Sequence, residues 1–315
     1  MQKIVNTKEM TRKEWLLQRR TGIGGSDVAT ILGLNKYNTP YQLWLDKTGQ
    51  IEVDVSDVSE AAHFGNVLED IVAKEFTARS GKRVRISNKM YSHKNYPYLT
   101  ANIDRDVVGE NAILECKTAS IYLSDKWEGN EIPEQYICQV QHYMNVLKRE
   151  YAYVAVLIGG QKFVWKKIER DQELIDLIQK RLVEFWEVNV MQSIAPPIDG
   201  SQATVDFIKE HYKDSEAGKE INLNKEFDGW VTKRDELKET EKIVKTSINE
   251  IENFMKQALG EKEAEIGITP HYLISWKPQT RTSIDSKILK EKYPDVYESV
   301  LKSSTNKTLR IKGIN

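Results

Sequence analysis

The stretch LTANIDRDVVGENAILECK, residues 99–117, decides the fold, because it predicts two strands joined by a short turn. Side chains alternate between the two faces of a strand, so every second residue shares a face. With Gly109 and Glu110 as the two turn residues, the hairpin register places Asp104 directly opposite Glu115. The two carboxylates are therefore expected to meet on one face of a sheet.

The second strand of this hairpin adds a lysine to the same place. Alternation puts Glu115 and Lys117 on one face, and Leu114 and Cys116 on the other. Like charges directly opposite each other on neighbouring strands repel, and a bound divalent cation is the usual remedy. Mg²⁺ prefers oxygen ligands, polarises a phosphate and activates bound water, which a neighbouring lysine can orient. An aspartate followed by Glu-x-Lys is typical of restriction-endonuclease-like nucleases, although an acid-x-Lys pair alone is more often a solvated strand face.

A third carboxylate is expected near this pair, on a helix predicted over residues 62–79. Glu69 lies at the edge of the predicted apolar face, whereas Asp70 points the opposite way. An unpaired carboxylate at the margin of a core is costly, so a metal ion or a basic partner is expected for Glu69. The alternative is an ordinary salt-bridged glutamate. The predicted apolar face consists of Phe64, Leu68, Ile71, Val72 and Phe76.

A glycine-rich turn, GIGGSD at residues 22–27, precedes a short helical pattern. A helix N-terminus with free N–H groups is a natural phosphate site. Ser26 or Asp27 can cap that helix, and Arg20, with Arg19 before it, adds positive charge. The alternative is a turn without a ligand.

A helix predicted over residues 133–149 carries amides and phenols among apolar residues. Gln139 and Tyr143 are four residues apart and share a face, as do Gln135 and Gln139. The alternative is that this polar stripe faces solvent.

The bulk composition narrows the class of protein. The chain has 315 residues, of which 40% are hydrophobic and 30% charged, as in globular proteins, and no apolar run approaches the length of a membrane span. A net charge of −1 means that any DNA contact depends on a local basic patch. The cysteines, Cys116 and Cys138, lack zinc-type spacing and are too few for a disulfide scaffold. A polar N-terminus without a signal-peptide pattern favours an intracellular location.

Helices and strands alternate along the first two-thirds of the chain, which predicts an α/β fold with a central mixed sheet flanked by helices. The predicted strands are at residues 82–90, 98–108, 112–118, 151–158 and 162–169. Paired prolines in APPIDG, residues 195–200, mark a linker. We therefore expect a core domain at 1–198 and a helix-rich accessory region at 199–315. That region contains a long helix at about 225–259 with heptad character, followed by a small β/helical tail. The long helix is expected to pack on its own domain, with a helical hairpin or intersubunit arm as the alternative.

Taken together, these segments resemble the YqaJ-type viral recombinases, relatives of lambda exonuclease. The resemblance covers roughly residues 12–170, and the ordered set of motifs is specific. The matching segments are RTGIGGSD (20–27), YQLW (41–44), KTG (47–49), GNVLE (65–69), ANID (101–104), LECKT (114–118) and QVQHY (139–143).

The resemblance implies a restriction-endonuclease-like core and a 5′-to-3′ exonuclease that degrades one strand of linear double-stranded DNA. The product would be a 3′ single-stranded tail for an annealing protein of the RecT/Red-beta type. The expected cofactor is Mg²⁺, in two ions, with Mn²⁺ as a substitute. The resemblance also implies a homo-oligomer, a trimer by analogy, in the cytoplasm of a bacterial host cell.

The same resemblance implies roles for individual residues. Asp104 and Glu115, with the carbonyl of Cys116, would bind Mg²⁺, and Lys117 would address the nucleophilic water. Glu69 would contribute to the second metal ion, and Gln139 would support the metal-bound waters or the scissile phosphate.

Arg20 and Ser26 would hold the 5′-phosphate. The turn between them is one residue shorter than in lambda exonuclease, which leaves the choice between Arg20 and Arg19 open.

Two other functions stay open on the residues alone. The first is an endonuclease or structure-specific nuclease on the same core, although the missing cysteine cluster argues against an iron–sulfur type. The second is a DNA-binding module that does not cut. Acidic groups facing phosphate argue against a pure binder. Linear and circular duplexes incubated with Mg²⁺ discriminate among the three.

Overall fold

The computed structural model describes residues 4–53, 55, 59–303 and 307–313. The chain forms two compact units, Met1–His211 and Tyr212–Asn315. The first unit includes α7 (Gln202–His211), which follows the proline-rich linker. The structural division therefore falls later than residue 198, and the assignment of separate functions to the two parts stays a prediction.

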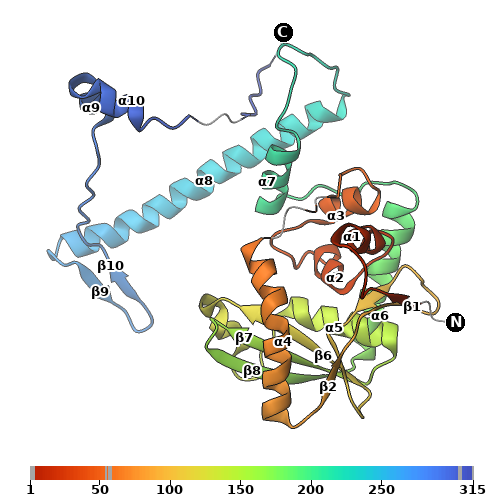
Figure 1. Cartoon of the computed structure of the whole chain (residues 1–315). Coiled ribbons are helices and arrows are strands. Elements are labelled where there is room, and N and C mark those ends of the chain that lie inside the picture. The colour runs from red at the N-terminus through yellow and green to blue at the C-terminus, as the bar shows by residue number, and fades with distance from the viewer. Residues whose placement is uncertain (1–3, 54, 56–58, 304–306, 314–315) are drawn as a thin grey trace. The chain divides into compact units, whose positions relative to one another are not determined.

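A five-stranded sheet with the order β2-β5-β6-β7-β8 forms the centre of the first unit (Figure 1). β6 and β7 are parallel, and the other neighbours are antiparallel, so the sheet is mixed. The predicted α/β fold with a central mixed sheet is confirmed. The strands are β2 (Val84–Ile86), β5 (Arg105–Val107), β6 (Ala112–Ala119), β7 (Tyr151–Ile158) and β8 (Lys162–Glu169).

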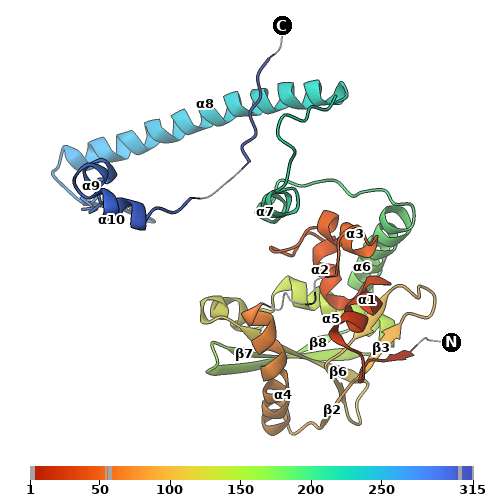
Figure 2. The ribbon, with the colours of Figure 1, turned by 45° about the horizontal axis from the view of Figure 1, so that its top comes forward.

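Two helices cover opposite faces of this sheet. α4 (Glu60–Ser80) lies across β6 and β7 (Figure 2) and contributes Val72 and Phe76 to a cluster with Leu114 and Cys116. α5 (Glu134–Leu147) contributes to the larger core, together with Ile113 of β6. Alternate residues of β6 thus face different helices, as the sequence predicts. Glu115 and Lys117 face the side of α5.

A second sheet lies at the edge of the first and has the order β1-β3-β4. Its strands are β1 (Ile4–Asn6), β3 (Lys89–Ser92) and β4 (Thr100–Asn102). The sequence predicted single strands at 82–90 and 98–108, but each of these segments is divided between the two sheets. Because β2 pairs with β5 while β3 pairs with β4, both segments change sheets together.

The predicted hairpin register holds across this division. Arg105 pairs with Leu114 and Asp106 with Ile113, in the register predicted, and Asp104 directly precedes the first of these pairs. The turn at the end of the hairpin contains Gly109, whose φ of 84° is in the left-handed region that favours glycine.

Three short helices precede the sheets. α1 (Arg12–Arg20) begins with a capping box between Thr11 and Glu14. α2 (Gly25–Ile31) follows the glycine-rich turn and contacts α5. α3 (Pro40–Lys47) begins with proline after the Thr39 N-cap. A 3₁₀ helix, η1 (Ile121–Trp127), follows β6, and α6 (Gln172–Glu184) continues as the π-helical segment η2 (Phe185–Val190).

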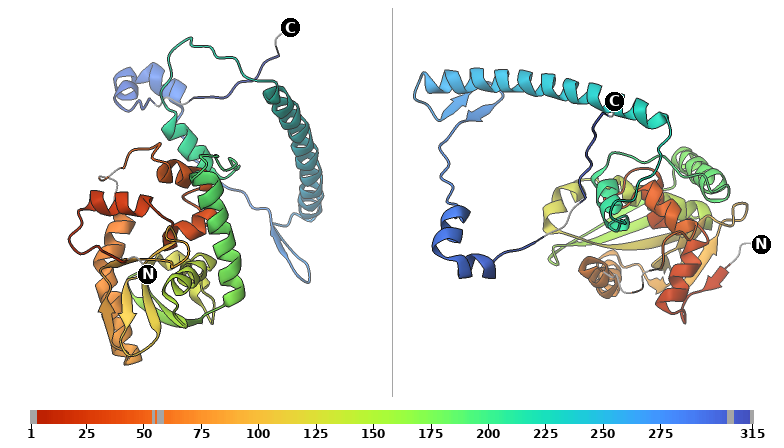
Figure 3. Two further views of the ribbon diagram at one scale, coloured as in Figure 1. Left: turned by 90° about the vertical axis from the view of Figure 1, so that its right-hand side faces the viewer. Right: turned by 90° about the horizontal axis from the view of Figure 1, so that it is seen from above.

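The second unit is dominated by one helix. α8 (Glu226–Gly260) is continuous, as Figure 3 shows, and confirms the predicted helix at 225–259. Leu259 is its buried residue, whereas Trp230, Leu237 and Ile251 are each more than half exposed. The hairpin of β9 (Ile266–Ile268) and β10 (Leu273–Ser275), then α9 (Ser286–Lys292) and α10 (Pro294–Ser299), complete the unit. None of the helices described in either unit is long and apolar enough to cross a membrane.

Candidate active site

Glu115 is the centre of the candidate site and is only 2% exposed. Its Oε1 accepts hydrogen bonds from Gln139 Nε2 and from Lys117 Nζ, both at 2.6 Å. Its Oε2 is buried and has no hydrogen-bond partner among the described residues. A buried anionic oxygen without a partner is costly. The open oxygen is therefore where a cation would fit.

Asp104 adds a second carboxylate. Its Oδ2 accepts a hydrogen bond from the Cys116 backbone N–H at 2.7 Å. Burial raises the pKa of the Asp104 carboxyl well above its usual range, and the charge of Glu115 raises it further. Burial also raises the pKa of the Glu115 carboxyl, although the charge of Lys117 partly offsets this. Two carboxyl groups that both resist ionisation are the electrostatic setting in which a divalent cation is most effective.

Lys117 supplies the positive charge of this cluster. Burial alone would lower the pKa of its ammonium group, but the charges of Glu115 and Asp104 outweigh burial and raise that pKa. The Lys117 Nζ also lies 5.1 Å from the centre of the Tyr136 ring, a cation–π distance. Glu115 and the Tyr136 ring together therefore hold the Lys117 ammonium group beside the carboxylates.

Glu69 has the basic partner that the sequence allowed for. Its carboxylate forms an ion pair with Arg105, which is 4% exposed and also donates to the Asp104 carbonyl at 2.9 Å. The salt-bridged alternative thus describes Glu69 in this structure. The predicted apolar face of α4 is partly wrong, because Phe64 and Ile71 are each 51% exposed. The first turns of α4 leave both side chains open to solvent, and burial on this helix begins at Val72.

Gln139 lies inside the protein, which rules out a solvent-facing position for it. The side chain is 7% exposed, and its Nε2 donates to Tyr143 Oη at 3.1 Å as well as to Glu115. Gln141, on the same helix, instead bonds the backbone of Glu169 and Asp171. Gln139 therefore belongs to the candidate site, whereas Gln141 stabilises the surrounding fold.

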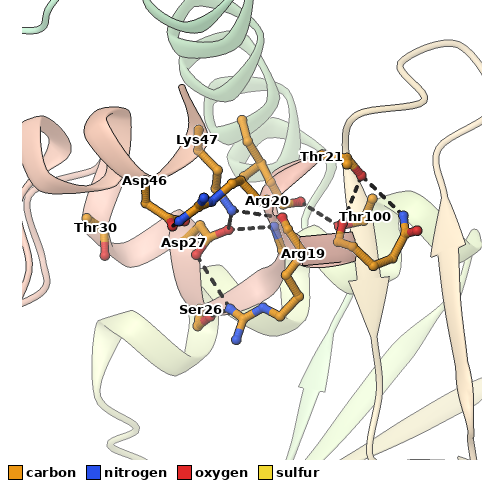
Figure 4. A network of polar contacts seen from close by, with 12 residues as sticks. Arg19, Arg20, Thr21, Ser26, Asp27, Thr30, Asp46, Lys47 and Thr100 are labelled. Atoms are coloured by element: carbon orange, nitrogen blue, oxygen red, sulfur yellow. Dashed lines mark hydrogen bonds and ion pairs between the residues drawn. The ribbon is translucent and has the colours of Figure 1, made fainter. Parts of the chain in front are cut away.

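The glycine-rich turn brings Ser26 together with Arg19 (Figure 4). Arg19 Nη2 donates to Ser26 Oγ at 2.5 Å and lies 3.6 Å from Asp27 Oδ1. Arg20 instead forms an ion pair with Asp46 at 2.7 Å and donates to the Ile51 carbonyl. Of the two adjacent arginines, the structure therefore joins Arg19, not Arg20, to Ser26.

A buried ion pair that the sequence analysis missed supports this turn. Asp27 is 8% exposed and accepts from Lys47 Nζ at 2.8 Å and from the Gly24 N–H at 3.0 Å. Burial alone would raise the pKa of the Asp27 carboxyl, but the charges of Lys47 and Arg19 hold it below its usual value. Lys47 belongs to the KTG segment that matched the family motif, and Asp27 belongs to the glycine-rich turn. The sequence motifs therefore contained both residues, but they did not indicate that the two form an ion pair.

The donor set fits Mg²⁺ in one specific way. No group of three or more Asp, Glu, His or Cys side chains in the described part of the chain is arranged to hold a metal ion. Two carboxylates, Asp104 and Glu115, do converge, and one oxygen of Glu115 is open. Mg²⁺ is commonly bound by one or two carboxylates, with waters and substrate phosphates completing its shell. These residues therefore fit Mg²⁺ as a site completed by water and substrate.

Comparison with known proteins places these residues in a wider context. A family model described as the YqaJ-like viral recombinase domain matches residues 14–150. The uncharacterized protein YqaJ of Bacillus subtilis (strain 168) is 49% identical over 314 residues, which cover 99% of this chain and 98% of that protein.

Solved structures similar to this chain include three exonuclease structures, two of which are of LHK-Exo. LHK-Exo in complex with dAMP has a TM-score of 0.49 and 20% identity, covering 57% of this chain and 93% of its own. The alkaline exonuclease LHK-Exo from Laribacter hongkongensis gives 0.48 and 18%, with the same coverage of 57% and 93%. A phage-related exonuclease from Haemophilus somnus 129PT gives 0.42 and 16%, covering 53% and 92%.

Proposed function

This chain belongs to the YqaJ-like viral recombinase family, and we propose that it is a Mg²⁺-dependent exonuclease. In this proposal it degrades one strand of linear double-stranded DNA from 5′ to 3′ and leaves 3′ single-stranded tails for recombination by strand annealing. The observation that carries the proposal is the open, buried Oε2 of Glu115 beside the Asp104 carboxylate and Lys117. Buried carboxyl groups of this kind favour a bound metal ion, and a bound metal ion would in turn attract a phosphate.

Asp104 and Glu115 would hold the metal, together with the backbone carbonyl of Cys116, and Glu69 would contribute to a second ion. Mn²⁺ is expected to substitute, because it accepts the same oxygen ligands. The bound metal would supply a polarised phosphate and a water of lowered pKa. For Glu69 to take part, its carboxylate has to share or exchange its ion pair with Arg105.

Of the remaining residues, Gln139 would position a metal-binding carboxylate and Lys117 would offset negative charge. Gln139 holds Oε1 of Glu115 in place, so that Oε2 would be available to bind the metal ion. Lys117, kept charged by the two carboxylates, would offset the negative charge that builds on the scissile phosphate. With a metal ion bound, the same amine would also orient the attacking water.

The 5′-phosphate would bind where Arg19 meets Ser26. Ser26 is exposed on the first turn of α2, and Arg19 already contacts its hydroxyl. A terminal phosphate carries more charge than an internal diester and suits this pairing of guanidinium and hydroxyl. Arg20 would not contact the phosphate directly, because its guanidinium group forms an ion pair with Asp46.

The test compares linear and circular duplex DNA of the same sequence with Mg²⁺. We expect digestion of the linear form and survival of the circle. Cutting of the circle would support an endonuclease on the same core, and survival of both forms would support a DNA-binding module that does not cut. A terminal-phosphate pocket at Arg19 and Ser26 favours the first outcome, because such a pocket binds only a DNA end.

The proposal extends to the partners of the enzyme. Its substrate is a double-stranded DNA end, and its product would pass to a single-strand annealing protein of the RecT/Red-beta type in the bacterial cytoplasm. The protein is proposed to work as a homo-oligomer, a trimer by analogy with lambda exonuclease. Light scattering on the full chain, with and without a DNA end, tests the assembly.

A further inference from the structure

Gly25 and Tyr143 are in unusually close contact. Gly25 is the first residue of α2 and is buried, while Tyr143 is on α5 and is 4% exposed. A Cβ added at Gly25 would lie 2.4 Å from ring carbons of Tyr143 and 2.5 Å from its hydroxyl oxygen. A real methyl group does not fit at such a distance. The start of α2 therefore rests directly on the tyrosine ring.

This contact stands between the two halves of the candidate site. On one side, Gly25 is followed by Ser26, which binds Arg19. On the other side, the Tyr143 hydroxyl accepts a hydrogen bond from Gln139, whose Nε2 also donates to Glu115. One rigid ring thus connects the proposed terminal-phosphate pocket to the proposed cleavage centre.

We infer that the Gly25–Tyr143 contact is a spacer that fixes which phosphodiester is cut, and therefore the length of the product. The inference rests on the proposed function, and it assigns a positioning role to two residues outside the catalytic set. A DNA strand held at its 5′-phosphate reaches the carboxylates at a bond determined by the distance between the two sites. Because cores are close-packed, that distance can change only if the ring or the helix start moves.

Gly25→Ala tests the spacer, and Gly24→Ala is its matched control. A Cβ at Gly24 would meet its nearest neighbours at 3.8 and 3.9 Å, which is ordinary contact. Both variants replace a glycine in the same turn, but only the first pushes α2 away from Tyr143. The substrate is a linear duplex labelled at its 5′-phosphate, incubated with Mg²⁺, and the readout is the length of the first labelled product.

We expect Gly25→Ala to release the terminal nucleotide about tenfold to a hundredfold more slowly, as a displacement of about 1 Å can cause. Because cleavage of the terminal bond is then slower, cleavage at the next bond, which is outcompeted in the wild type, should contribute a larger share of the first products. Gly24→Ala should keep the wild-type product length. Tyr143→Phe keeps the ring and should also keep that length, whereas Tyr143→Leu should broaden it. In the Tyr143→Leu background, adding Gly25→Ala should have little further effect, because the space is then available.

The outcomes separate this inference from the proposed function. A wild-type protein that does not cut the linear duplex contradicts the proposed function itself. A wild type that cuts, with unchanged product lengths in Gly25→Ala and Tyr143→Leu, contradicts the spacer alone. So does an equal effect of Gly25→Ala with and without the tyrosine ring. Thermal unfolding of each variant identifies loss of fold, and if Gly25→Ala does not fold, the comparison of Tyr143→Phe with Tyr143→Leu decides.

Discussion

Gln139 Nε2 donates to Glu115 Oε1 at 2.6 Å, so a helix on one face of the sheet holds a carboxylate of the central strand. Lys117 shares that same oxygen. With one oxygen engaged twice, the other remains open. The hydrogen bond thus gives the carboxylate a fixed direction.

Asp104→Asn and Glu115→Gln should each abolish DNA cleavage while DNA binding persists or tightens. Both changes remove a negative charge near phosphate and keep the shape of the side chain. Asp106→Asn is the matched control, because Asp106 is on the neighbouring strand and pairs with Arg149 at 2.7 Å. Cleavage rates and DNA affinity are measured in Mg²⁺ for all three. Full activity in either site variant would contradict the assignment.

Metal binding should be visible without catalysis. A ligand that binds only the folded state raises the apparent stability by RT ln(1 + [L]/Kd). Mg²⁺ or Ca²⁺ should therefore raise the Tm of the wild type, and Glu115→Gln should lose most of that increase. Ca²⁺ should support DNA binding without cutting, because its coordination is longer and looser. Equal metal-induced shifts in the two proteins would place the metal elsewhere.

Lys117→Met should slow the chemical step by about 10²–10⁴, the range for a lost acid–base or charge-stabilising group. Single-turnover rates measure this step directly. Lys167→Met is the control, because Lys167 forms its ion pair with an exposed glutamate, Glu169, on β8. A Lys117 variant that unfolds, with its residual folded fraction fully active, would show that the lysine is structural.

Arg19→Ala should erase most of the preference for a 5′-phosphate over a 5′-hydroxyl end. Arg20→Ala should keep that preference and lower stability instead, because it leaves Asp46 and the Ile51 carbonyl without their donor. Initial digestion rates on duplexes that differ only in the 5′ group provide the measurement. Equal rates on the two ends in the wild type would falsify the pocket. A preference lost in Arg20→Ala but kept in Arg19→Ala would reverse the two roles.

Because of His142, the free energy of unfolding should decrease as the pH is lowered from about 6.5 to about 4. Its ring is 1% exposed and its Nε2 donates to the Thr100 carbonyl at 2.8 Å. Burial lowers the pKa of His142 to about 4, with Asp27 opposing and His93 reinforcing the effect through their charges. Below pH 6.5 His142 becomes protonated in the unfolded chain but stays neutral in the folded protein. The free energy of unfolding therefore decreases as the pH falls.

The contribution of His142 amounts to about 3 kcal/mol across that range. Denaturant unfolding at a series of pH values measures it, and His142→Gln should flatten that part of the curve. An unchanged pH dependence in the variant would assign the effect to other groups.

Local patterns were sufficient for the central part of the fold. β7 and β8 begin and end at the residues that their apolar and alternating patterns predicted. The register of β5 and β6, which brings Asp104 toward Glu115, followed from turn length and alternation alone, because both are properties of a short continuous segment.

Contacts between distant segments were not accessible in that way. Helical periodicity placed Glu69 at the margin of the core, but its ion pair with Arg105 depends on how α4 docks on the sheet. The choice between Arg19 and Arg20 depends likewise on Asp46, whose position follows from the packing of α3. The division of the 98–108 segment between two sheets depends on its pairing partners, and its own residues carry no break signal.

The number of residues in the turn around Gly109 constrains the candidate site as strongly as the identity of the site residues does. Since strand side chains alternate, a single inserted residue that shifted the register of β6 would turn Glu115 and Lys117 toward α4 and bring Leu114 or Cys116 to the opposite face. Every residue of the site would still be present in such a sequence. A library of insertions and deletions should therefore show a sharp intolerance at residues 108–111, even though Val108 and Asn111 are exposed and should each tolerate substitution.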